Sequence, residues 1–167
     1  KSSFSGAGRE DIDARCLDYR PFVIELIKPR IRKIDLKRIE KQINKSKKVK
    51  VKGLKIVEFG KEFIRNLKAE RIDKTYLAEV EFEKEVDKKK LKFLKGLIKE
   101  PILQKTPLRV IHRRADKFRK RNVKKISWKV NEKRLWLRVT AESGLYIKEL
   151  ITGDEGRTRP NVSDLLE

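Results

Sequence analysis

Apolar and polar side chains alternate along four stretches of the chain, which is the pattern of β-strands that bury one face. The clearest alternation ends at Phe82, which shares one face with Tyr76, Ala78 and Val80. Two other alternating stretches, residues 126–130 and 134–140, are separated by three polar residues, which predicts a hairpin. A fifth stretch is almost continuously apolar and predicts a buried strand. The predicted strands are residues 21–27, 49–56, 75–82, 126–130 and 134–140.

In other stretches, apolar side chains recur three or four positions apart, which predicts helices. Asp35 and Asp87 are suitable N-caps for the first two helices, and Asn161 or Ser163 for the last. The predicted helices are residues 35–44, 87–98, 145–151 and 161–166. We expect the basic stretch 109–125 to be extended. Helices among hairpin-like strands favour the α+β class, with a mixed or antiparallel sheet flanked by helices.

The charge of the chain is high and is concentrated in two places. Of 167 residues, 46 are Lys or Arg and 25 are Asp or Glu, which gives a net charge of +21. Residues 28–55 carry a net +11 and residues 105–125 a net +9. Charge gathered in this way favours contact with a nucleic acid. The alternative is a set of solvated Lys-rich faces of the kind that thermophilic proteins carry.

The composition excludes several classes of site. A single cysteine, Cys16, excludes an internal disulfide and a multi-cysteine zinc site, and a single histidine, His112, leaves little for histidine-based catalysis. The Gly6-Ala-Gly8 turn lacks the third glycine of a dinucleotide loop, and there is no Walker pattern, so we expect no nucleotide cofactor. No apolar run approaches the ~20 residues of a membrane span, so we expect no membrane partner.

Cys16 and His112 also have ordinary structural explanations. We expect Cys16 to be a small core residue, in keeping with a reducing cytoplasm. His112 lies in the second basic stretch, where it could contact phosphate or a base, or could be a buried structural histidine.

Carboxylates beside cations remain as candidates for chemistry, and they gather in residues 9–15, which hold three acids and two arginines. In an extended segment, Asp11 and Asp13 project to the same side. A neighbouring cation keeps such a carboxylate ionised and able to act as nucleophile or base. On spacing alone, a salt-bridged surface turn is the better explanation, because ion-pair networks outnumber catalytic ones.

Three motifs, in chain order, change that balance. Gly8-Arg-Glu-Asp-Ile-Asp-Ala-Arg15 resembles the motif around the catalytic aspartate of pseudouridine synthases. The other two are Gln104-Lys-Thr-Pro-Leu-Arg-Val-Ile-His-Arg-Arg-Ala-Asp116 and Glu142-Ser-Gly-Leu-Tyr-Ile-Lys-Glu-Leu150, the latter continuing through residues 153–160. All three resemble motifs of the pseudouridine synthase ten family, a group of archaeal and eukaryotic tRNA-modifying enzymes. The resemblance extends over residues 6–166 and implies the α+β catalytic fold of that superfamily.

The resemblance assigns roles to four residues. Asp11 matches the catalytic aspartate, whereas Asp13 is assigned no chemistry. Tyr76 matches the active-site tyrosine that stacks on the target base. Lys148 matches the basic residue that pairs with the aspartate, and Ile147 the adjacent apolar wall. Spacing alone would instead make Tyr76 a core residue and Lys148 a solvent-facing helix residue. The reaction implied needs no cofactor and no metal.

Five arginines of the second basic stretch are predicted to contact the backbone of folded RNA. They are Arg109, Arg113, Arg114, Arg119 and Arg121. Few aromatic side chains interrupt them, which disfavours stacking along a single strand. The loop 153–160, with Arg157 and Arg159, could close over the substrate or could be a surface loop.

The resemblance implies that residues 1–167 are a catalytic domain acting on the T-loop and arm of tRNA, at uridines 54 and 55. Members of the family also carry an N-terminal RNA-binding module with a zinc site and a closing C-terminal segment, so we expect this chain, which lacks methionine, to be a fragment without them. Two alternatives stay open: a non-catalytic RNA-binding module in which Asp11 is structural, and a ribosome-associated structural protein.

Overall fold

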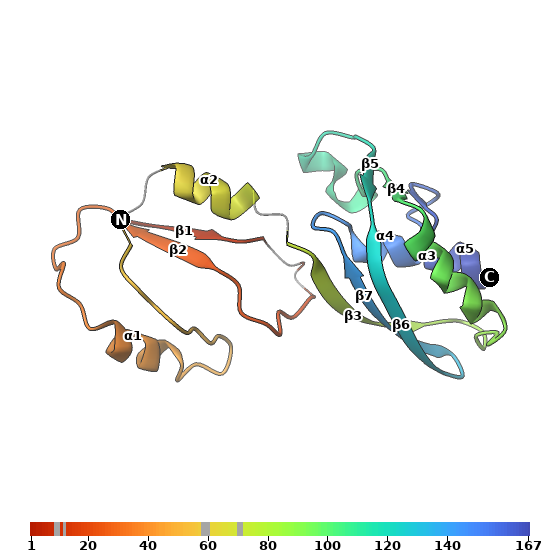
Figure 1. Ribbon diagram of the computed structural model, residues 1–167, viewed down its shortest axis with the longest axis horizontal. Coiled ribbons are helices and arrows are strands. Elements are labelled where there is room, and N and C mark those ends of the chain that lie inside the picture. The colour runs from red at the N-terminus through yellow and green to blue at the C-terminus, as the bar shows by residue number, and fades with distance from the viewer. Residues whose placement is uncertain (9–10, 12, 58–60, 70–71) are drawn as a thin grey trace. The chain divides into compact units, whose positions relative to one another are not determined.

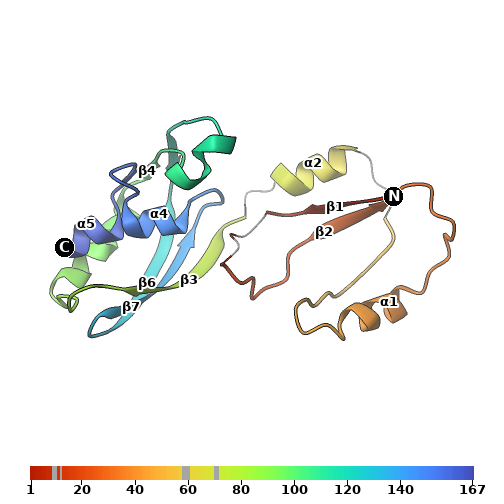
Figure 2. The same ribbon diagram turned by 180° about the vertical axis from the view of Figure 1, so that it is seen from behind.

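A computed structural model of the chain describes residues 1–8, 11, 13–57, 61–69 and 72–167. The chain forms two compact units, Lys1–Glu70 (unit 1) and Arg71–Glu167 (unit 2), whose elements are labelled in Figures 1 and 2. Helices and antiparallel sheets occur together, so the α+β prediction is confirmed. Within the ranges described, no helix is both long enough and apolar enough to cross a membrane.

The described residues of unit 1 form a two-stranded antiparallel sheet and two helices. Its elements are β1 (Ser2–Gly6), β2 (Phe22–Leu26), α1 (Leu36–Ile43) and α2 (Lys61–Ala69). Gly6 lies opposite Phe22 in the sheet, and α2 contacts β1. The strand predicted at residues 21–27 is confirmed as β2, but the prediction that it is buried is wrong. Ile24 and Leu26 remain 51% and 54% exposed, because β2 pairs with a single strand among the described residues.

The helix predicted at residues 35–44 is confirmed as α1, and the Asp35 carboxylate caps it by accepting the N–H of Arg38 at 3.0 Å. The strand predicted at residues 49–56 is wrong, because this stretch has no regular secondary structure. Its backbone instead forms hydrogen bonds with side chains in α1 and at the C-cap of that helix. The Asn44 amide donates to the Val51 carbonyl at 2.8 Å and accepts the Val51 N–H at 2.7 Å.

Unit 2 holds two three-stranded antiparallel sheets, with strand orders β3-β7-β6 and β5-β4-β8. The strands are β3 (Lys74–Glu81), β4 (Ile102–Gln104), β5 (Arg119–Arg121), β6 (Val123–Asn131), β7 (Arg134–Ala141) and β8 (Thr158–Arg159). The helices are the 3-10 helices η1 (Lys90–Lys95) and η2 (Leu108–Arg113) and the α-helices α3 (Gly96–Lys99), α4 (Ile147–Thr152) and α5 (Val162–Leu166).

The hydrophobic core lies between one face of the β3-β7-β6 sheet and the helices beside it (Figure 1, Figure 2). Every second residue of β7 contributes to it, and the helices supply leucines and a valine. The core residues include Leu94, Leu97, Leu135, Leu137, Val139, Ala141, Leu150 and Val162. Burial of this apolar surface is the main stabilising contribution to unit 2.

Four local predictions in unit 2 are confirmed. β3 alternates half-buried and exposed residues, as predicted for residues 75–82, and β6 and β7 form the predicted hairpin with Asn131 opposite Arg134. α4 and α5 match the helices predicted at residues 145–151 and 161–166. Asn161 caps α5 by accepting the N–H of Asp164 at 2.9 Å. Gly153 ends α4 in the left-handed region, with a φ of 79°.

Two predictions need correction. The helix predicted at residues 87–98 is the 3-10 helix η1 followed by the short α3. The extended conformation predicted for residues 109–125 holds for β5 and from Val123 onward, but the start of this stretch is the 3-10 helix η2. The reason is hydrogen bonding at the start of η2: the Pro107 carbonyl accepts the N–H of Val110 at 3.0 Å, and the carboxylate of Asp154, far along the chain, accepts the N–H of Leu108 at 3.1 Å.

Candidate functional site

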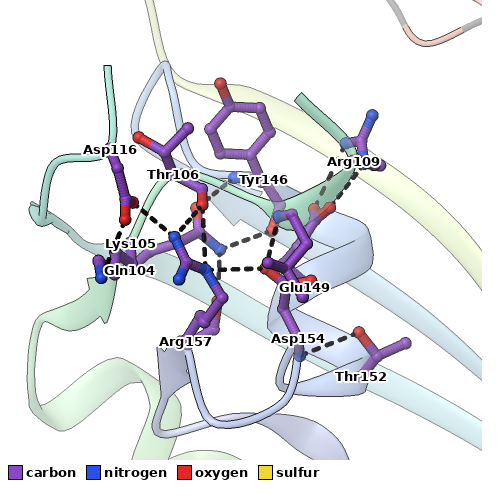
Figure 3. Close-up of polar contacts among 12 residues, drawn as sticks. Gln104, Lys105, Thr106, Arg109, Asp116, Tyr146, Glu149, Thr152, Asp154 and Arg157 are labelled. Carbon is purple, nitrogen blue, oxygen red and sulfur yellow. Dashed lines mark hydrogen bonds and ion pairs between the residues drawn. The ribbon is translucent and has the colours of Figure 1, made fainter. Parts of the chain in front are cut away.

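The second and third motifs meet in unit 2, where a network of hydrogen bonds and ion pairs joins residues 104–116 to residues 142–160 (Figure 3). The two segments are distant in sequence, yet several pairs of residues connect them, including the following three. Gln104 bonds to Tyr146, Arg109 to Glu149, and Asp116 to Arg157. The network surrounds the start of α4, the helix that carries Ile147 and Lys148.

Gln104, at the end of β4, bonds to the backbone of Tyr146 through both ends of its side-chain amide. Its Nε2 donates to the Tyr146 carbonyl at 3.0 Å, and its Oε1 accepts the Tyr146 N–H at 2.8 Å. The same Nε2 donates to Thr158 Oγ1 of β8 at 3.1 Å. Gln104 itself is buried, and its bond to Thr158 is buried with it, whereas the two bonds to Tyr146 are partly buried.

Glu149 is a buried carboxylate, only 3% exposed, in the first turn of α4. Arg109 of η2 neutralises it, donating from Nε to Oε1 at 2.6 Å and from Nη2 to Oε2 at 3.4 Å. A two-point bond between a guanidinium and a carboxylate fixes orientation as well as distance. The pair therefore holds η2 and α4 in a fixed mutual position.

Arg157 ties the loop before β8 to the second motif. Its Nε and Nη2 donate to the Thr106 carbonyl at 3.2 and 2.8 Å, and Nη2 also bonds to the Asp116 carboxylate. Asp116 lies 2.9 Å from Lys105 Nζ as well. The hydrogen bond from Lys105, together with the positive charge of Arg157, lowers the pKa of Asp116. Arg157 is therefore held by residues of the second motif.

Thr106 is a buried junction within the second motif. Its hydroxyl donates to the Ala115 carbonyl at 2.7 Å. It accepts the Lys117 N–H at 3.1 Å and Arg119 Nη1 at 2.8 Å. These bonds close the loop after η2 and set the direction in which the chain enters β5.

The ring of Tyr146 lies beside two guanidinium groups. The guanidinium carbons of Arg109 and Arg114 are 5.7 and 5.9 Å from the ring centroid, within the range of cation–π attraction. Arg114 also donates from Nη1 to the Tyr146 hydroxyl at 2.6 Å. A positively charged, partly exposed surface therefore adjoins the start of α4.

A second carboxylate of the third motif, Glu142, is bound by Asn122. The side-chain Nδ2 and the backbone N–H of Asn122 each donate to it at 2.9 Å. These bonds, the side-chain bond first, lower the pKa of Glu142. Glu142 thus fixes the segment that leads from β7 toward α4.

The structure places three of the four residues assigned by resemblance in unit 2. Ile147 is the first residue of α4 and packs against the core, and Lys148 follows it and is exposed. Tyr76 is half-buried on β3, opposite Val139 of β7. Asp11 is half-buried in unit 1.

The structure describes only part of the first motif. Arg9, Glu10 and Ile12 lie outside the described residues. No group of three metal-ligating side chains occurs among the residues that the structure describes.

The five predicted RNA-binding arginines differ in their surroundings. Arg109, Arg114 and Arg119 bond within the network described above. Arg121 donates from Nε to the Ser143 carbonyl at 3.1 Å. Arg113 projects from η2 and is exposed.

Two single residues are also placed by the structure. Cys16 is exposed, so the prediction that it is a small core residue is wrong; its Sγ donates to the Asp18 carbonyl at 3.0 Å. His112 is exposed as well, which excludes the buried structural role and leaves a surface position in η2.

Sequence reasoning missed the residues that hold the site together. They are Gln104, Thr106, Glu149 and, as a scaffold residue, Arg157. All four lie inside the second and third motifs, which was the only indication available, because their partners are backbone atoms or charges far along the chain.

Comparisons with known proteins find relatives over the whole length of the chain. The family model described as "Pus10, C-terminal" matches residues 1–167. The protein named tRNA pseudouridine synthase Pus10 from Methanocaldococcus jannaschii is 48% identical over 172 residues, covering 99% of this chain and 37% of that protein. Its namesake from Methanothrix thermoacetophila is 44% identical over 166 residues, with coverages of 98% and 37%. The one from Archaeoglobus fulgidus is 46% identical over 161 residues, with coverages of 95% and 44%. The chain therefore spans well under half the length of these relatives.

Proposed function

The chain belongs to the Pus10 C-terminal family, and from this membership we propose that residues 1–167 are the catalytic domain of a tRNA pseudouridine synthase. The observation that carries the proposal is the match over the entire chain, all three motifs included, to proteins of that name. The proposed substrate is the T-loop and arm of tRNA, at uridines 54 and 55, in the cytoplasm. The proposal includes no membrane partner and no nucleotide cofactor.

The chemistry suits the residue types present. Isomerisation breaks the bond between N1 of uracil and C1′ of the ribose and joins C5 to C1′. C5 loses a proton and N1 gains one, so no group leaves and no electrons are transferred. An ionised Asp11 carboxylate is sufficient to attack C1′ or to remove a proton from the ribose. Both routes balance without a redox cofactor.

The other roles follow from the nature of the side chains. By the resemblance, Lys148 is the basic residue that pairs with the catalytic carboxylate during the reaction. Tyr76 offers an aromatic face to a uracil that has left its stack, which recovers part of the few kcal/mol that base flipping costs. Ile147 forms an apolar wall. The five arginines of residues 109–121 neutralise phosphates of the tRNA.

The proposal is tested by Asp11→Asn in the full-length enzyme, with release of tritium from C5-labelled uridine in a tRNA transcript as the assay. We expect turnover to fall by more than about 1,000-fold, as on removal of other catalytic groups, with tRNA affinity within about twofold of wild type. Asp13→Asn is the matched control: it removes a neighbouring carboxylate, and we expect it to retain turnover. Persistent activity in Asp11→Asn would instead favour a non-catalytic RNA-binding module.

A further inference from the structure

We propose that Gln104 is a positioning residue of this enzyme: its side-chain amide fixes the start of α4 and thereby the backbone of Ile147 and Lys148. The inference rests on the proposed function, since it concerns two residues to which that function gives roles. It adds a residue with no expected contact to substrate, on a strand distant in sequence from α4.

The start of α4 needs hydrogen-bond partners from outside the helix. The first N–H groups of a helix have no partner within the helix, and a side chain at the N-cap residue usually accepts one of them. The N-cap of α4 is Tyr146, which makes no such bond. In a capping box, the residue three positions later reaches back to the N-cap N–H. That residue is Glu149, and its carboxylate is bonded to Arg109.

Gln104 accepts the hydrogen bond that Glu149 would accept in a capping box. Its Oε1 accepts the N-cap N–H, and its Nε2 donates to the N-cap carbonyl, so both polar atoms of the Tyr146 backbone are held by one rigid amide group. Gln104 itself is only 2% exposed, and Thr158 holds its Nε2 from the other side. An amide with three bonds in a buried site has little freedom to reorient.

The two hydrogen bonds between the Gln104 amide and the Tyr146 backbone form a clamp, which matters because α4 is short. The helix has six residues, far fewer than the ~12 that an isolated helix needs to be even marginally stable in water. Its start is therefore set by outside contacts. Because Ile147 and Lys148 are the first two residues after Tyr146, any shift of the N-cap backbone moves both directly.

The experiment uses the full-length enzyme and a tRNA transcript, with kcat and KM measured separately. Gln104→Met keeps the length of the side chain and removes all three bonds. We expect kcat to fall about 10- to 100-fold, the effect of misplacing reactive groups by about 1 Å, with KM within about twofold of wild type. A merely structural defect would reduce the amount of folded enzyme and leave both constants of the folded fraction unchanged.

Asn44 supplies a matched control, because its amide forms the same two-bond clamp on the backbone of Val51 in unit 1. Asn44→Leu removes a clamp of equal chemistry that does not hold the backbone of α4, and we expect kcat to stay within about twofold of wild type. An equal fall of kcat in both variants would overturn the proposal, as would an unchanged kcat in Gln104→Met.

Gln104→Glu decides the matter if the Met variant does not fold. At neutral pH the new carboxylate still accepts the Tyr146 N–H but repels the Tyr146 carbonyl. We expect its kcat to fall about 10-fold or more relative to wild type, with KM within about twofold, because one of the two bonds to the Tyr146 backbone is lost. A kcat equal to that of wild type contradicts the positioning role.

Parallel assays of the wild type and Asp11→Asn separate the two levels of the proposal. If wild type forms no pseudouridine, or Asp11→Asn is fully active, the proposed function fails. If both behave as proposed and the Gln104 variants retain the wild-type kcat, the positioning role alone fails.

Discussion

The two units of the chain are stabilised in very different ways. Unit 2 buries a continuous set of leucines and valines between a sheet and several short helices, and polar side chains lock its loops. Among the described residues of unit 1, no hydrophobic side chain is buried, and Ile24 and Leu26 lie about half in solvent. Yet unit 1 carries Asp11 and the more strongly charged of the two basic stretches. Residues that we assign to chemistry and RNA contact are thus not confined to the well-packed part of the molecule.

The largest difference between the units should appear in core substitutions. Leu137→Ala removes a fully buried side chain of β7 and should lower the free energy of unfolding by about 3 kcal/mol. Ile24→Ala in β2 should change it by less than about 1 kcal/mol, because half of that side chain is already in water. Both tryptophans lie in β6 and β7, so denaturant titrations followed by tryptophan fluorescence report unit 2, and amide hydrogen exchange of β2 reports unit 1. Equal losses in the two variants would contradict the contrast.

A smaller effect separates two arginines within unit 2. Arg109→Met leaves the buried Glu149 carboxylate without the guanidinium that neutralises it, and should cost about 2 kcal/mol of stability. Arg113→Met removes an exposed side chain and should cost less than about 0.5 kcal/mol, while still weakening tRNA binding. Stability and tRNA affinity, measured on both variants, show whether the basic stretch divides into scaffold and RNA-contacting residues. Loss of stability in both would argue against that division.

The basic stretch of unit 1 is tested by salt dependence. Replacing the exposed Lys37, Lys41 and Lys45 by Gln should lower the slope of log affinity against log salt by up to ~0.7–0.9 for each phosphate that is no longer neutralised. Stability should not change, because these side chains bury no apolar core. The matched triple variant replaces Lys88, Lys89 and Lys92, which are exposed outside both basic stretches. A similar slope change in the control would mean that total charge, and not its location, determines binding.

The smallest effect expected is a pH dependence in unit 2. Because the pKa of Asp116 is lowered in the folded state, the unfolded chain binds more protons there, and stability rises with pH. The contribution is complete above the ordinary aspartate pKa of about 3.9 and is lost as pH falls through the lowered value. Asp116→Asn should therefore be less stable than wild type at neutral pH and equal to it in acid. Unfolding midpoints between about pH 7 and about pH 1 test this. A stability difference independent of pH would contradict it.

Local sequence patterns were sufficient for the elements that carry their own start and stop residues. Asp35 and Asn161 are N-caps that act on residues three positions away, and the β6–β7 hairpin needs only a short polar turn between alternating strands. The stretch 49–56 has the same alternation, but its backbone bonds to Asn44 and Glu40 instead of to a partner strand. Alternation shows that a segment has two faces and does not identify its partner. β1 and α2 were not predicted at all.

The site was predictable only through resemblance. That route assigned roles to Ile147 and Lys148, which lie at the start of one helix, and to Asp11 and Tyr76, and all four roles remain predictions. It gave no role to Gln104 or Thr106, whose hydrogen bonds join side chains to backbone atoms. Bonds of that kind leave no pattern of complementary side chains along the chain, so only the folded arrangement reveals them.

The clamp between Gln104 and Tyr146 has a consequence for how the two positions can vary. Because the amide bonds to main-chain atoms of Tyr146, which every residue but proline provides, the clamp restricts position 104 and leaves the side chain at position 146 free to change. The two positions should therefore show no correlated substitutions among relatives, although they are in direct contact. Methods that infer contacts from correlated changes would miss this one.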